Sequence, residues 1–283
     1  MFIIHVGWFL FFVFTNFSGA VEIKEFKWKL LILMGIIAAT AIIYFIWLKK
    51  IKIVKKILAL TWKIIFTGYI AFFIYFLIGF IFNPPVTLTQ LGSMVQGNGL
   101  SRDYISYSAM GPNIKLAVIA SEDQLFPDHD GFDIKAIKLA MKYNKRHPNK
   151  TRGASTISQQ TAKNIFLWQG ESDIMKYLRK GPEFYFTQLI EWIWGKQRIL
   201  EVYLNTIEMG KGIFGIEAAA QTYFHKPAKS LTRSEAAQII ACLPNPKVYT
   251  AKPQSRFVSW KSKWILRQMN NIQDDPDIQA LMK

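Results

Sequence analysis

The 283-residue sequence has very few of the residues that build disulfide frameworks and zinc sites. Cys242 is its one cysteine, which excludes an internal disulfide and a cysteine-rich zinc centre. Its four histidines are scattered and form no HExxH pattern, which argues against a zinc hydrolase. Acidic residues are also few, 19 against 35 Lys and Arg, so the formal net charge is +16. This balance favours an anionic partner, whether nucleic acid, anionic lipid or a phosphorylated substrate, without choosing among them.

Charge is almost absent from three apolar stretches near the N-terminus, which cover about residues 2–20, 30–48 and 64–82. The second and third are long enough to cross a hydrocarbon core of ~30 Å as helices. The first is shorter, and the lack of a basic segment before it favours a third span over a cleaved signal. We therefore predict a transmembrane anchor region at residues 1–83 and a second domain at residues 84–283.

The orientation of these spans is indicated by KKIKIVKK, residues 49–56, which has five lysines and no acid. Such a cluster beside short spans marks the cytoplasmic side of a membrane. The third span then leads to the opposite face, where Pro84 and Pro85 end the helix. The sequence thus places the domain that follows outside the cytoplasm.

The second domain nearly lacks alternating strand patterns, and helical periodicity predicts a mainly α fold. Helices are expected after Asp133, around Gln159, from Glu183 to Asn205 and after Thr232. GKGIFG, residues 210–215, matches the glycine pattern of dinucleotide-binding folds. The residues before it are typical of a helix and not of a strand, so we predict a tight turn leading into a helix instead.

Two segments concentrate polar residues that are candidates for chemistry. SEDQLFPDHDGFD, residues 121–133, contains five carboxylates, a histidine and a glycine, and a solvated acidic turn is the alternative. In RGASTISQQTAKNIF, residues 152–166, Thr156, Gln160 and Lys163 would share one helix face. That strip suits sugar hydroxyls and amides, although an exposed polar face would have the same pattern.

Two further segments follow. In LRKGPEFYF, residues 178–186, Gly181 and Pro182 predict that a helix begins with Glu183 in its first turn. Arg179 and Lys180 beside that helix start suggest a pyrophosphate site, with a solvated ion pair as the alternative. KQRILEVYLN, residues 196–205, is typical of a scaffold helix rather than of a substrate contact.

In this order the four segments resemble the bacterial peptidoglycan glycosyltransferases of glycosyltransferase family 51. They are most similar to its monofunctional members, which are related to the glycosyltransferase domain of class A penicillin-binding proteins. EDxxFxxHxG, GxSTxxQQxxKN, RKxxE and RILExYLN are all intact, within a resemblance that covers residues 83–249. It implies a mainly α, lysozyme-like domain with a membrane-associated jaw, preceded here by two or three transmembrane helices instead of the usual one.

The resemblance also implies roles for individual residues. Glu122 takes the position of the catalytic base and Glu183 that of the second essential acid. The substrate-binding positions are Phe126, His129, Gly131, Ser155, Thr156, Gln160, Lys163, Asn164, Arg179 and Lys180. No metal-binding residue and no obligatory cofactor is expected, although a divalent cation, Mg or Mn, at the pyrophosphate is left open.

The implied reaction transfers the growing lipid-pyrophosphate-linked glycan chain, with inversion, onto the 4-hydroxyl of lipid II and releases polyprenyl diphosphate. Its partners would be lipid II, the nascent strand and the membrane, with other cell-wall synthesis or division proteins as further candidates and no nucleic acid. The implied location is the bacterial cytoplasmic (inner) membrane, with the catalytic domain on its periplasmic side. A lysozyme-like hydrolase or lytic transglycosylase, or a non-catalytic assembly scaffold, is the alternative. Transpeptidation is excluded because the sequence contains no SxxK or KTG.

Overall fold

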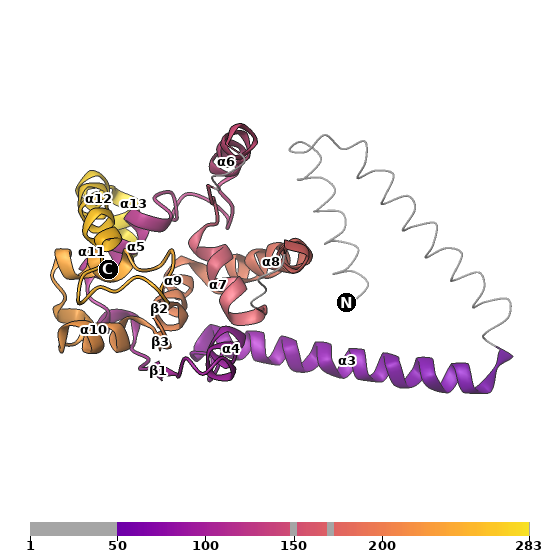
Figure 1. The fold of residues 1–283 in the computed structure, drawn as a ribbon. Helices are drawn as coiled ribbons and strands as arrows, with labels where there is room; N and C mark the ends of the chain where they lie inside the picture. The colour runs from indigo at the N-terminus through magenta and orange to yellow at the C-terminus, as the bar shows by residue number, and fades with distance from the viewer. Residues whose placement is uncertain (1–49, 148–151, 169–172, 283) are drawn as a thin grey trace. The chain divides into compact units, whose positions relative to one another are not determined.

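The structure, a computed structural model, describes residues 50–147, 152–168 and 173–282 (Figure 1). The spans predicted at about residues 2–20 and 30–48 lie outside the described residues. Of the described residues, 50–78 belong to one compact unit and 79–282 to a second.

The helix α3, Lys52–Ile81, contains the third predicted apolar stretch. Its 30 residues extend about 45 Å at ~1.5 Å per residue, and one 18-residue window has a mean hydropathy of 2.4. Among the described residues, it alone is long and apolar enough to cross a membrane. The helix begins earlier than the apolar stretch because lysine is a good helix former, and it ends just before Pro84 and Pro85, as predicted.

The second unit is mainly helical, which confirms the mainly α part of the predicted fold class. Besides two single 3-10 turns, η2 (Tyr107–Ala109) and η3 (Ala228–Ser230), its described helices are α4 (Leu88–Val95), α5 (Pro112–Glu122), α6 (Ile134–Arg146), α7 (Ile157–Phe166), α8 (Asp173–Ile193), α9 (Gly195–Thr206), α10 (Ile216–Phe224), α11 (Arg233–Ile240), α12 (Arg256–Ile272) and α13 (Pro276–Met282). The stretch expected as one helix up to Asn205 is broken at Gly195, whose φ of +73° is outside the helical region.

The centre of this unit is α5, which packs against α11, α12 and α13 (Figure 1). All of its residues from Ile114 to Ala120 are buried, so the helix has no solvated face and must lie in the core. Pro112 occupies its first turn, where a missing N–H has no cost. The last residue of this buried helix is Glu122, which is half-buried. Packing of α5 in the core therefore fixes the position of Glu122.

A second layer is built by α7, which packs on α8 and α9. The Phe166 ring lies 5.1 Å from the ring of Phe186 and 6.0 Å from that of Trp194. Helix starts in both layers are encoded by capping boxes, in which a threonine side chain and a Gln or Glu three residues later satisfy each other's backbone N–H groups. The three pairs are Thr87 with Gln90, Thr156 with Gln159 and Thr232 with Glu235.

A small sheet joins β1 (Ser101–Arg102), β2 (Glu208–Gly210) and β3 (Ile213–Phe214) in the order β1-β3-β2. A short strand therefore does precede the glycine pattern, contrary to the prediction, because two or three residues are too few to show an alternating period. The strands β2 and β3 are antiparallel and α10 follows the turn, as predicted. An antiparallel hairpin is not the parallel strand–helix unit that binds dinucleotides.

The helix α9 has the predicted role of a scaffold. The Asn205 side chain donates to the carbonyl of Ile105 at 2.9 Å and accepts from its N–H at 3.1 Å. Glu201 accepts from the N–H of Tyr107 at 3.1 Å and from Arg198 at 2.7 Å. These bonds satisfy the backbone of the segment that leads into α5.

We expect Asn205→Ala to destabilise the protein by about 2–6 kcal/mol, since it leaves two backbone groups of Ile105 unpaired at a cost of about 1–3 kcal/mol each. Asn205 is fully buried, so water cannot replace the lost amide. Thermal unfolding of the purified protein in detergent measures the effect. Asn271→Ala, an exposed position on α12, is the matched control and should change stability by less than about 0.5 kcal/mol. Equal shifts in the two variants would contradict the scaffold role of α9.

Candidate active site

The half-buried carboxylate of Glu122 is held by hydrogen bonds at both oxygens. Ser121 donates to Oε1 at 3.0 Å, and the Gln160 amide donates to Oε2 at 3.0 Å. The hydroxyl of Tyr203 donates in turn to Gln160 Oε1 at 3.1 Å. Burial, followed by the charges of Glu122 and Asp123, raises the pKa of Tyr203 well above its usual value, so the hydroxyl keeps its proton. Tyr203 thereby fixes which end of the Gln160 amide faces Glu122.

The loop after Glu122 is organised by Asp123. Its carboxylate accepts from His129 Nε2 at 3.0 Å and from the backbone N–H of Ile157, the first residue of α7, at 3.0 Å. The N–H of Gly131 donates to His129 Nδ1 at 3.1 Å, which assigns the imidazole proton to Nε2. A carboxylate at a helix N-terminus is also favoured by the helix dipole. One buried aspartate thus joins the first predicted segment to the second.

Phe126, His129 and Gly131 lie inside this loop rather than in an open pocket. Phe126 is fully buried, with its ring edge-on to His129 at 6.3 Å. Gly131 has a φ of +90°, and a Cβ there would lie 2.9 Å from the Thr187 methyl group. The three residues therefore shape the loop that follows Glu122.

Thr156 does not extend the polar strip predicted for Gln160 and Lys163. It is the N-cap of α7, so its backbone is extended, and its hydroxyl donates to the carbonyl of Gly131 at 2.7 Å. The predicted strip is wrong at this position because an N-cap residue lies outside the helical spacing. The neighbouring Ser155 is exposed.

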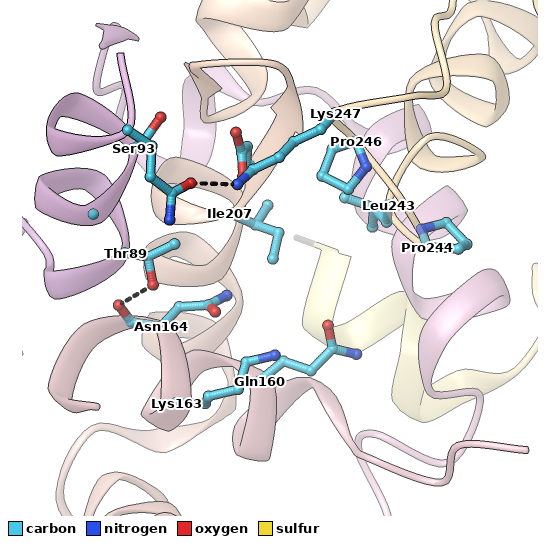
Figure 2. Close-up of a pocket in the computed structure, with 13 residues that line it drawn as sticks. Thr89, Ser93, Gln160, Lys163, Asn164, Ile207, Leu243, Pro244, Pro246 and Lys247 are labelled. Atoms are coloured by element: carbon cyan, nitrogen blue, oxygen red, sulfur yellow. Dashed lines mark hydrogen bonds between the residues drawn. The ribbon is translucent and has the colours of Figure 1, made fainter. Parts of the chain in front are cut away.

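Gln160, Lys163 and Asn164 line a pocket of about 400 Å³, within the range of roughly 300–1,000 Å³ typical of ligand sites. Figure 2 shows Gln160 and Lys163 side by side on one wall. Thr89 on α4 donates to the carbonyl of Asn164 at 3.1 Å. The other lining residues are Gly92, Ser93, Gln96, Ile207, Glu208, Leu243, Pro244, Pro246 and Lys247.

Arg179, Lys180 and Glu183 form a cluster of charges that is close enough to Lys163 to affect its pKa. The Glu183 carboxylate, almost fully buried, accepts from Lys180 Nζ at 2.7 Å, and its Oε2 lies 3.9 Å from Arg179 Nε. The pKa of Lys163 is lowered chiefly by burial; Glu183 and Glu122 oppose that shift, while Arg179 and Lys180 add to it. Lys163 is therefore within electrostatic reach of both carboxylates. Three cations and one carboxylate, Glu183, leave two net positive charges, which match a pyrophosphate.

The predicted helix start at Pro182 is wrong. The helix α8 begins at Asp173 and continues through Gly181 and Pro182, which places Arg179, Lys180 and Glu183 in mid-helix. A proline inside a helix costs about 3 kcal/mol, and packing of α8 against α7 outweighs that cost. Free N–H groups of a helix start therefore cannot contribute to the cluster, whose positive charge comes from side chains alone.

The structure adds residues that the sequence patterns did not single out. Lys196 donates to Glu191 at 2.7 Å and to the carbonyl of His129, and its Nζ lies 4.7 Å from the Phe126 ring centre. Lys261 on α12 has its pKa lowered by burial and partly restored by the charge of Glu122. Only the position of Asp123 directly after Glu122 was a usable signal, because the other contacts join distant segments.

Comparison with known proteins identifies the family of this chain. The pattern that defines the transglycosylase family matches residues 89–270, which is most of the chain. The chain belongs to the transglycosylase family. The match includes Glu122, Lys163 and Glu183, and it confirms the family predicted from the sequence and, with it, a glycosyl-transfer activity.

Individual relatives of this transglycosylase are close. A protein of Escherichia coli named biosynthetic peptidoglycan transglycosylase is 49% identical over 201 residues, which cover 70% of this chain and 81% of the relative. A protein of Shigella boydii with the same name has the same identity and coverage. One from Mannheimia succiniciproducens, also so named, is 56% identical over 170 residues, or 60% of this chain and 68% of the relative.

Proposed function

We propose that the chain polymerises the glycan strands of peptidoglycan from lipid-linked disaccharides at the outer face of the bacterial cytoplasmic membrane. One observation carries the proposal: Gln160, which donates to Glu122 at 3.0 Å, lines the same pocket as Lys163, and the charges of Glu183, Arg179 and Lys180 are close enough to affect the pKa of Lys163. A proton acceptor beside a cationic pocket is what glycosyl transfer from a pyrophosphate requires. The names of the relatives support the same substrate class.

In the proposed reaction the 4-hydroxyl of lipid II loses its proton to Glu122 while its oxygen attacks the anomeric carbon of the growing chain. The bond between that carbon and the pyrophosphate oxygen breaks with inversion, and polyprenyl diphosphate leaves with the electron pair. Lys163, Arg179 and Lys180 stabilise the departing charge, so the leaving group needs no proton. Gln160, oriented by Tyr203, holds Glu122 in place.

Two other functions predict different chemistry. A hydrolase or lytic transglycosylase also uses carboxylates, but its polymeric substrate has no pyrophosphate, so the cluster around Glu183 would have no purpose. A non-catalytic scaffold would need neither that cluster nor the hydrogen bonds that hold Glu122.

Labelled lipid-linked disaccharide tests the proposed function directly. The purified full-length protein should convert it into long glycan strands and release one polyprenyl diphosphate for each glycosidic bond that forms. Peptide-free glycan strands, offered separately, should remain uncut. Cleavage of those strands without polymerisation of the lipid-linked substrate would establish the hydrolase instead.

A divalent cation, Mg or Mn, remains part of the proposal at the pyrophosphate. Among the described residues, no three His, Cys, Asp or Glu side chains gather into a metal site. Glu183 Oε2 accepts no hydrogen bond, so it could supply one oxygen ligand. The phosphates and water would then supply the others, as is usual for magnesium.

We also infer that the domain is lysozyme-like and that α6 belongs to its membrane-associated jaw. Ala140 is the one buried residue of this helix, while Ile134, Leu139 and Met141 are about half exposed. Five basic residues accompany them: Lys135, Lys138, Lys142, Lys145 and Arg146. An exposed helix with apolar and basic side chains suits the surface of an anionic membrane.

The proposed topology predicts the accessibility of introduced cysteines. Cys242 is buried and should react little, so Lys50→Cys and Asp274→Cys can each be labelled alone. In right-side-out membrane vesicles, a membrane-impermeant maleimide should label Asp274→Cys and not Lys50→Cys, because basic segments stay in the cytoplasm. Detergent should expose both, which is the control. Labelling of Lys50→Cys alone in intact vesicles would place the domain in the cytoplasm and refute the proposed function.

A further inference from the structure

One face of α12 presents a continuous row of aromatic rings. Phe257, Trp260, Lys261 and Trp264 follow one another at offsets of three, four and seven residues from the first, which is the spacing of one helix face. The ring centres of Phe257 and Trp260 lie 5.9 Å apart, and Lys261 Nζ lies 3.6 Å from the centre of the Trp264 ring. The Trp260 side chain is 63% exposed, so this face is open to a ligand.

The row is extended from a second segment. The Tyr249 ring stacks on Phe257 at 4.2 Å with an angle of 14° between the planes. A stack of this kind is worth about 0.5–1.5 kcal/mol beyond the area it buries, so it holds in place the Phe257 ring, whose centre lies 5.9 Å from that of the exposed Trp260. The surface is therefore already ordered without a ligand.

Residues of this row and of the segments next to it lie near the candidate active site. Lys261 is close enough to Glu122 for that carboxylate to affect its pKa. Gln268, farther along α12, accepts a hydrogen bond of 3.1 Å from Gln124, two residues after Glu122. Tyr249 comes two residues after Lys247, which lines the pocket together with Leu243, Pro244 and Pro246 (Figure 2).

We propose that Tyr249, Phe257, Trp260 and Lys261 form a platform that binds a sugar ring of the glycan strand beside Glu122. A pyranose ring has a flat C–H face, which packs on the electron-rich face of an aromatic ring, and a rim of hydroxyl groups for the ammonium of Lys261. Ligand sites commonly combine such aromatic surface with a few polar groups. The inference rests on the proposed function for the identity of the sugar polymer.

The platform increases the time that the strand remains bound between additions. A strand held at several sugars leaves more slowly than one held only at its pyrophosphate, because simultaneous contacts raise the effective concentration of each. Loss of the platform should therefore shorten the products more than it slows the transfer of the first sugars.

The test uses the full-length protein in detergent with Trp260→Ala, Trp260→Phe and the matched control Trp192→Ala, a 57% exposed tryptophan on α8. Calorimetric titration with peptide-free glycan strands should show an affinity about tenfold weaker for Trp260→Ala, equivalent to ~1.4 kcal/mol. Trp260→Phe, which keeps a ring, should lose less than about threefold, and Trp192→Ala should match the wild type. On lipid-linked disaccharide, Trp260→Ala should make shorter strands.

Other outcomes overturn the platform. If Trp260→Ala kept the wild-type glycan affinity and product length, the platform would be refuted. A defect confined to the binding of phosphatidylglycerol vesicles would also refute it and would make this face a membrane contact. Absence of polymerisation by the wild type would refute the proposed function instead. The titration with glycan strands would still decide whether the platform binds sugar.

Discussion

Glu122→Gln is expected to lower the rate of glycan polymerisation by about 10²–10⁴-fold, the usual contribution of a general base. The structure explains why the fold should survive this change. Tyr203 fixes the Gln160 amide so that its nitrogen faces residue 122, and the new amide oxygen can still accept from it. The new NH₂ group can donate to Ser121 Oγ, which reverses the existing hydrogen bond. The variant loses only its ability to take a proton.

Single-turnover reaction with labelled lipid-linked disaccharide measures this effect, with substrate binding measured separately. Glu235→Gln on α11 is the matched control and should keep the wild-type rate, since its carboxylate belongs to a helix cap. More than about a tenth of the wild-type rate in Glu122→Gln would contradict the assignment of the base.

Removing one buried cation should slow the reaction by about tenfold to a hundredfold. A charge-assisted hydrogen bond contributes about 1.5–3 kcal/mol, and ~1.4 kcal/mol corresponds to a factor of ten. We expect Lys163→Ala and Arg179→Ala to show this loss, because Lys163 is largely buried and the Arg179 side chain is only 11% exposed. Lys180→Ala should have a smaller effect, since its side chain is 58% exposed and water screens its charge.

Arg179→Lys separates charge from geometry. Lysine keeps the positive charge but loses the planar fork that binds two phosphate oxygens, so a rate between those of Arg179→Ala and the wild type is expected. Lys229→Ala, an exposed position outside the site, is the control for loss of one charge. Changes of less than about threefold in both Lys163→Ala and Arg179→Ala would remove the pyrophosphate site, because that is the scale of exposed ion pairs.

Local signals in the sequence were sufficient for several helix starts. The helix after Asp133 begins where its side chain accepts from the N–H of Ala136, and the helix after Thr232 begins with a capping box. These starts depend on residues three positions apart, which a sequence displays directly. The role expected of Glu122 came instead from the resemblance of its segment to the family, and the structure places this residue at the end of α5.

The features that the sequence did not reveal depend on contacts between distant segments. Pro182 suggested a helix start, and only the packing of α8 on α7 keeps the helix continuous through it. Tyr203 bonds to a side chain 43 positions earlier, and Lys261 follows Glu122 by 139 positions yet is close enough for that carboxylate to affect its pKa. No spacing rule connects such residues. The short strands of the sheet were not predictable for another reason: two or three residues are too few to show an alternating pattern.

The double attachment of Asp123 limits how chimaeric enzymes can be assembled from this chain and a relative. Its carboxylate bonds to His129 in its own loop and to the first backbone N–H of α7, 34 positions later. Thr156, at the start of α7, makes a further bond between the same two segments by donating to the carbonyl of Gly131. Residues 121–133 and 152–166 should therefore be exchanged together. A crossover between them would combine a loop from one protein with a helix from the other and could disrupt the hydrogen bonds that connect the two.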